Sequence, residues 1–183
     1  EIPIIDGSSK PFTDIIEETG VAEQEAAKIW YSIDTNISFY DDAKRVEMTA
    51  LPATSYHLTT LIDFNSPVLG TQHASLKLME DFKTEIAPCR TFCFLHELEM
   101  LLENNLVKGG DINNAIVVVD KPVTDEEMNR LAKAFGRKKV EVKSEGYLNN
   151  LELRFPNEPA RHKLLDVVGD LALIGYPIKA HII

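Results

Sequence analysis

The stretch RHKLLDVVGD, residues 161–170, says more about the fold than any other part of the sequence. Leucine and valine recur in it at helical spacing, which predicts a helix over residues 159–173 that Gly175 and Pro177 end. Apolar side chains lie on most sides of this helix, so we expect it to be buried. A buried helix of this length needs a sheet or other helices to cover it.

Residues earlier in the chain predict such a sheet. Residues 27–64 alternate in polarity and are rich in β-branched and aromatic side chains, with Asp41-Asp42 as a hairpin turn, which predicts several antiparallel strands. Thr124 and Glu127 have the spacing of a capping box at the start of a helix. Further strands are expected at residues 73–78, 115–119, 138–142 and 147–155, and further helices at 11–18, 80–86, 95–104 and 124–136. The pattern favours an α+β fold, a two-layer sandwich of helices against a largely antiparallel sheet.

Composition excludes several classes of function. A chain of 183 residues with 44% hydrophobic content can bury a core. Its net charge of -10 disfavours nucleic acid and anionic lipid as partners. We expect no transmembrane segment and no signal peptide, and therefore a cytoplasmic protein. Cys89 and Cys93 are expected to be free thiols.

A polar column interrupts the apolar helix. Side chains four residues apart project from one helix face, so His162, Asp166 and Asp170 lie in a line. A histidine nitrogen and a carboxylate oxygen at this spacing can reach one metal ion, and catalytic zinc accepts both kinds of ligand. Asp170 could orient a neighbouring group. The alternative is a simple ion pair between His162 and Asp166 with Asp170 in solvent, and spacing alone leaves both open.

Motifs along the whole chain resemble those of one family. Residues 157–171, NEPARHKLLDVVGDL, contain R-H-K-x-x-D-x-x-G-D-L. Four other motifs precede it: EIPIIDGS at 1–8, IDF at 62–64, APCRTFCF at 87–94, and LVKGG followed by NAIVV within 106–118. In this order they resemble the UDP-3-O-acyl-N-acetylglucosamine deacetylases, the zinc amidases of lipid A biosynthesis.

The resemblance implies roles for the polar residues of the helix. His162 and Asp166 would be two of three protein ligands to a catalytic Zn²⁺. Asp170 would orient a catalytic histidine outside this chain. Lys163 would face the nucleotide diphosphate, where an ammonium is a suitable point charge.

The resemblance also implies substrate contacts. Thr91 and Phe92 would line the substrate site, while Leu98, Val107 and Gly110 would border the passage for the acyl chain. Leu98 and Val107 would equally suit the core of any fold, and Gly110 an ordinary turn.

The resemblance places this chain inside a longer enzyme. Residues 1–26 would end the first deacetylase domain, and 27–183 would form the second domain of a duplicated-domain deacetylase, with an inserted helix-strand region at about 120–150. The family's third zinc-binding histidine and its acidic general base would precede Glu1, and its catalytic histidine would follow Ile183. His181 does not match the family's G-H-x-x-N motif.

The implied activity is hydrolysis of the N-acetyl group of UDP-3-O-(3-hydroxyacyl)-N-acetylglucosamine, the committed step of lipid A and hence lipopolysaccharide biosynthesis in Gram-negative bacteria. The partners would be this UDP-linked acylated glucosamine and the missing portions of the same enzyme. We expect the chain alone to be inactive, because it lacks the base and the catalytic histidine. The alternative is a non-catalytic module that binds an acyl chain or a nucleotide, with a purely structural His/Asp helix.

Overall fold

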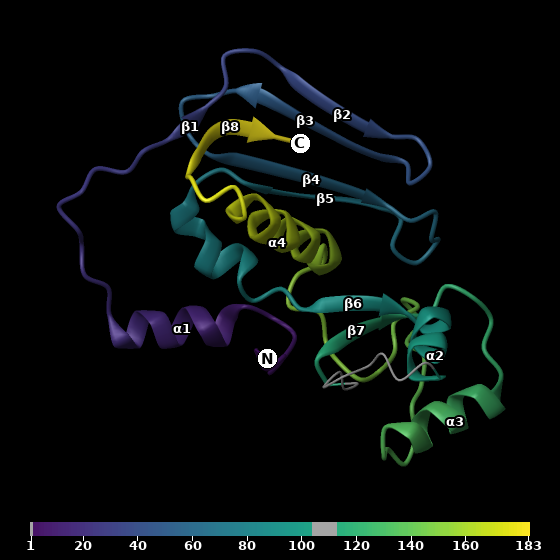
Figure 1. Ribbon diagram of the computed structural model, residues 1–183. Coiled ribbons are helices and arrows are strands. Elements are labelled where there is room, and N and C mark those ends of the chain that lie inside the picture. Colours follow the sequence, from purple (N-terminus) through teal and green to yellow (C-terminus); the bar gives the residue numbers. More distant parts are fainter. Residues whose placement is uncertain (1, 104–112) are drawn as a thin grey trace.

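A computed structural model describes residues 2–103 and 113–183 and confirms the α+β class. The main sheet is mostly antiparallel and has the strand order β2-β3-β8-β4-β5, with β1 paired to β8 (Figure 1). Its strands are β1 Tyr31–Ser32, β2 Ile37–Asp41, β3 Val46–Pro52, β4 His57–Asp63, β5 Thr71–Leu76 and β8 Ile178–Ile182. The Asp41-Asp42 hairpin turn forms between β2 and β3 as predicted.

The helix of the quoted stretch, α4 Glu158–Ala172, packs against this sheet (Figure 1). Ala160 and Leu164 are fully buried with Leu58 and Leu76 of the sheet in one hydrophobic core. This helix is amphipathic rather than buried on all sides, since Asp166 and Asp170 are exposed. The expectation of a buried helix is therefore wrong for the face that carries the polar column.

A smaller unit lies beside the N-terminal end of α4 (Figure 1). Its two-stranded parallel sheet consists of β6 Thr91–Phe94 and β7 Ala115–Val118. Helices α2 Leu95–Glu103 and α3 Asp125–Ala134 belong to it. Its core is a cluster of apolar residues, Leu95, Leu98, Val117, Val119, Leu131, Ala132, Val140 and Leu148.

The remaining helical segments lie before β1 and between β5 and β6. Helix α1 spans Lys10–Thr19 and ends at Gly20, as the sequence predicts. The helix expected at residues 80–86 is a 3₁₀ turn, Met79–Asp81, followed by a π-helical turn, Phe82–Ile86. None of the helices in the described parts of the chain is both long and apolar enough to cross a bilayer.

The strands predicted at residues 138–142 and 147–155 do not form. Only isolated bridges join Val118 to Tyr147 and Val142 to Leu148. The backbone N–H of Glu141 donates to the side-chain Oδ1 of Asn149 at 3.0 Å, so it does not pair with a neighbouring strand. Strands β6 and β8, in contrast, were not predicted.

Candidate metal and substrate site

The imidazole of His162 is hydrogen-bonded at one nitrogen and lies near a carboxylate at the other. Nδ1 lies 3.1 Å from the carbonyl oxygen of Cys89, and Nε2 lies 3.6 Å from Oδ1 of Asp166. A carbonyl oxygen can only accept, so Nδ1 carries a proton, and Nε2 is the nitrogen that faces Asp166. The side chain of His162 is 13% exposed, and that of Asp166 is 43% exposed. The open side of the pair thus lies at Asp166.

This pair fits two corners of a zinc site. Zinc bonds of 2.0 to 2.1 Å in a tetrahedron put two ligand atoms about 3.3 Å apart. The observed 3.6 Å between Nε2 of His162 and Oδ1 of Asp166 is close to that edge. The hydrogen bond from Nδ1 to a backbone carbonyl is a usual outer contact of a metal-binding histidine. Within residues 2–103 and 113–183, however, no cluster of three or more His, Cys, Asp or Glu could hold a metal ion.

Asp166 is stabilised by solvent and by a lysine instead of being buried. Nζ of Lys163 lies 3.0 Å from Oδ2 of Asp166. The same ammonium lies 5.9 Å from the ring centroid of Phe92 on β6. Phe92 in turn packs edge-on against Phe64, with ring centroids 5.7 Å apart. The structure therefore brings His162, Lys163 and Asp166 together with Phe92, from a strand far away in sequence.

The other predicted site residues lie at different places. Thr91 is partly buried beside Phe92 at the start of β6, and Asp170 is exposed one turn beyond Asp166. Leu98 is buried in the core of the smaller unit. Val107 and Gly110 lie outside the described residues.

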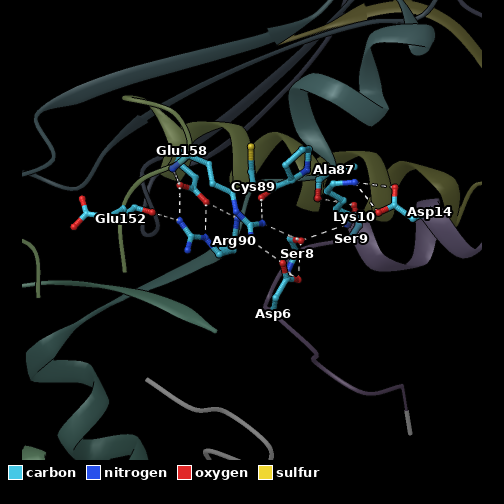
Figure 2. Close-up of polar contacts among 12 residues, drawn as sticks. Asp6, Ser8, Ser9, Lys10, Asp14, Ala87, Cys89, Arg90, Glu152 and Glu158 are labelled. Carbon is cyan, nitrogen blue, oxygen red and sulfur yellow. Dashed lines mark hydrogen bonds and ion pairs between the residues drawn. The ribbon is translucent and has the colours of Figure 1, made fainter. Parts of the chain in front are cut away.

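A buried ion pair that was not predicted from the sequence lies next to this site. Nε and Nη2 of Arg90 donate to Oε1 and Oε2 of Glu158 at 2.9 and 3.1 Å (Figure 2). Both side chains are almost completely buried, and Glu158 is 0% exposed. No local pattern signals this pair, because its residues lie 68 positions apart; once buried, such charges need a partner.

A second arginine connects this region to the N-terminal turn. Nη2 of Arg154 lies 2.8 Å from Oδ2 of Asp6, and Nη1 donates to the carbonyl of Pro88 at 2.6 Å. Partial burial acts to raise the pKa of Asp6, but hydrogen bonds from Arg154 and Ser8 outweigh it and hold the pKa below its usual value. The N-terminal residues are thereby attached to the loop that contacts His162.

The two cysteines are free thiols, as expected. Burial, with the nearby charge of Glu158, raises the pKa of the Cys89 thiol to about 12. Burial also raises the pKa of Cys93, to about 11. Both side chains are therefore protonated at neutral pH.

Comparison with known proteins agrees with the resemblance seen in the sequence. The family model for LpxC, UDP-3-O-acyl N-acetylglycosamine deacetylase, matches residues 1–140 and 138–183. The chain is 46% identical to the bifunctional enzyme LpxC/FabZ of Chlorobaculum tepidum and 43% identical to that of Porphyromonas gingivalis, covering 40% of each. It is 37% identical to the UDP-3-O-acyl-N-acetylglucosamine deacetylase of Syntrophotalea carbinolica, covering 51% of it.

All of this chain aligns with each of these three relatives, while it spans about half of their length or less. The match to the family model extends over the entire chain. The chain therefore belongs to the LpxC family of UDP-3-O-acyl N-acetylglycosamine deacetylases.

Proposed function

We propose that this chain is part of a zinc-dependent deacetylase that hydrolyses the N-acetyl group of UDP-3-O-(3-hydroxyacyl)-N-acetylglucosamine in lipid A biosynthesis. Membership of the family and the printed names of the relatives support the reaction class. The observation that carries the site assignment is the geometry of His162 and Asp166, whose Nε2 and Oδ1 atoms lie 3.6 Å apart. The reaction would take place in the cytoplasm of a Gram-negative bacterium.

His162 and Asp166 would hold the zinc ion with one nitrogen and one oxygen. Bound zinc would polarise the acetyl carbonyl and lower the pKa of a bound water toward about 7. The carbonyl of Cys89 keeps the proton of His162 on Nδ1, so that Nε2 is available as a ligand. Asp170, on the exposed side of α4, would orient a catalytic histidine from another part of the protein.

Residues beside the metal ligands would bind the substrate. The ammonium of Lys163 would bind the diphosphate as a point charge. Thr91 and Phe92 would line the sugar site, since Phe92 already lies beneath Lys163. Leu98, Val107 and Gly110 would border the acyl passage.

The chain by itself would be inactive. His162 and Asp166 would supply two zinc ligands, and a catalytic site of this kind uses three. The third ligand, the general base and the catalytic histidine would come from the family's length that this chain does not span.

Zinc titration by calorimetry tests the proposal. We expect tight binding by a protein of the relatives' full length, weak binding by the present chain, and a large loss of affinity in full-length His162→Ala and Asp166→Asn. Asp14→Asn is the matched control, because Asp14 is an exposed carboxylate in an i,i+4 ion pair on α1. Unchanged zinc affinity in His162→Ala would reject the assignment.

A second candidate is a non-catalytic module that binds an acyl chain or a nucleotide. The same His162–Asp166 geometry suits a structural ion pair, which is the observation in its favour. Binding of the UDP-linked acylated sugar that survives both chelation and His162→Ala would support this candidate.

A further inference from the structure

Cys89 and Arg90, which are adjacent in the chain, are held by two residues one turn apart on α4. Glu158 binds Arg90, and His162 binds the carbonyl of Cys89 (Figure 2 shows the first of these contacts). Positions i and i+4 of a helix project from the same face, so both side chains point at the same loop. The orientation of His162 thus depends on where that loop is held against the helix.

Glu158 makes the strongest of the contacts that hold the loop. Besides the guanidinium of Arg90, its carboxylate accepts from the backbone N–H of Arg90 at 3.0 Å and from that of Arg154 at 2.6 Å. Hydrogen bonds to an ionised group are about twice as strong as neutral ones, and burial strengthens them further. With both carboxylate oxygens occupied, this buried charge is fully compensated.

Neighbouring backbone groups of the loop are fixed as well. Ser9 donates to the carbonyl of Ala87 at 3.3 Å, Arg154 donates to that of Pro88 at 2.6 Å, and the amide of Thr91 donates to the carbonyl of Gly7 at 3.0 Å. Residues 87–91, named here the 87–91 segment, are therefore hydrogen-bonded residue by residue. A shift of the Cys89 carbonyl by about half an ångström would break its 3.1 Å contact with Nδ1.

We propose that Arg90 and Glu158 are positioning residues for the metal ligand His162: they fix the 87–91 segment on α4 so that the Cys89 carbonyl selects the Nδ1–H tautomer. This inference rests on the proposed function, because it assigns Nε2 to zinc. The Nδ1–H form is the minor tautomer of a free neutral imidazole, so its dominance at His162 is a property that the loop must impose.

The tautomer can be measured without metal. We suggest nitrogen-15 NMR of the histidine side chains in the zinc-free full-length protein at mildly alkaline pH. The variants are Glu158→Gln, Arg90→Lys and the double variant Arg90→Met with Glu158→Met, which removes both charges while keeping apolar volume. Zinc affinity is then measured by calorimetry on the same proteins.

We expect wild type to show Nδ1–H at His162, and the folded variants to show Nε2–H or a mixture, with zinc affinity lowered about 10- to 100-fold. Leu131→Ala is the control, since it removes core volume from α3, whose cluster includes no residue of α4 or of the 87–91 segment. It should lower the melting temperature and leave both the tautomer and the zinc affinity unchanged.

Three outcomes would overturn the inference: a folded variant that retains both the Nδ1–H form and wild-type zinc affinity, a Leu131→Ala protein that changes them equally, or failure of all three variants to fold. The last result would make the pair purely structural. Failure of the proposed function would give a different result. Zinc affinity would then be unchanged in His162→Ala, while the Arg90 and Glu158 variants would still alter the tautomer of His162.

Discussion

Nδ1 of His162 donates to the carbonyl oxygen of Cys89 across 3.1 Å, joining two residues that are 73 positions apart in the sequence. Cys89 is fully buried, so its carbonyl has little access to water if this donor is lost. The contact makes one side chain both a structural link and a candidate metal ligand. The structural contact and the candidate metal contact of the ring would use different nitrogens, so substitution can separate them.

Substituting asparagine or glutamine for His162 should separate the structural contact of the ring from its candidate metal contact. His162→Asn places an amide N–H near the position of Nδ1, so we expect the chain to lose less than about 1 kcal/mol of stability. His162→Gln reaches toward the position of Nε2 and leaves the Cys89 carbonyl unpaired, which should cost about 1 to 3 kcal/mol. Urea unfolding measures both, and zinc affinity of the full-length protein should fall in both. Equal stability of the two variants would show that the Nδ1 contact does not matter.

The thiols should resist alkylation in the folded protein. Raising the Cys89 pKa from 9.0 to about 12 lowers its thiolate population at pH 8 about a thousandfold, and a pKa of about 11 lowers that of Cys93 about a hundredfold. We expect iodoacetamide to label Cys93 slowly, Cys89 more slowly still, and both rapidly in urea. Mass spectrometry of labelled peptides measures the order. Rapid labelling of Cys89 without denaturant would contradict the packing around the 87–91 segment.

The Asp6–Arg154 contact should make stability depend on acid pH. The pKa of Asp6 is lower in the folded protein than its usual 3.8, so its contribution is present above that value and is lost as the pH falls through the folded pKa. Asp6→Asn should therefore lower the melting temperature at pH 6, and the difference from wild type should shrink as the pH falls below 3.8.

Asp14→Asn is the control for this experiment. It removes an exposed i,i+4 ion pair with Lys10, and such pairs contribute little to stability. A difference between Asp6→Asn and wild type that stays constant from pH 6 to pH 3 would contradict the role of the charge.

Local signals predicted the α-helices, whereas non-local pairing decided the strands that were missed or wrong. The start of α3 and the end of α1 depend on residues within one turn, so local sequence patterns predict them. Strand β8 exists because it lies between β3 and β4, where His181 is opposite both Leu51 and His57. Nothing near residue 181 encodes these neighbours.

In the candidate site, too, local spacing was predictable from the sequence and long-range contacts were not. Helical periodicity alone aligned His162 with Asp166, and the structure finds them 3.6 Å apart. The Arg90–Glu158 pair joins residues 68 positions apart, so no local pattern could predict it. The roles of Thr91, Phe92 and Lys163 came from the resemblance, and the contact between Lys163 and Phe92 shows that their elements meet.

The capping box of α3 should be measurable by itself. The Oγ1 atom of Thr124 accepts from the amide of Glu127 at 3.3 Å, and the amide of Thr124 donates to the Glu127 carboxylate at 2.7 Å. Thr124→Ala should cost about 1 kcal/mol and speed amide hydrogen exchange over residues 125–134. Glu126→Ala, in the same turn but outside the box, should change exchange little. Equal effects of the two substitutions would show that the cap does not hold this helix.

Substitution of Lys163 should weaken nucleotide binding without weakening metal binding. Its ammonium lies 3.0 Å from Oδ2 of Asp166 and above the ring of Phe92, so its loss removes a cation from the site without removing a ligand atom. In the full-length protein, Lys163→Met should raise KM for the UDP-linked substrate about tenfold, which corresponds to about 1.4 kcal/mol, with a smaller change in kcat.

Zinc affinity is the decisive second measurement for this variant. Without the lysine, the charge of Asp166 is less compensated, so zinc should bind as tightly as before or more tightly. Lys10→Met is the control, because Lys10 makes a comparable exposed i,i+4 ion pair on α1, and it should change neither KM nor zinc affinity. A loss of zinc binding in Lys163→Met would mean that the lysine supports the metal ligand rather than the diphosphate.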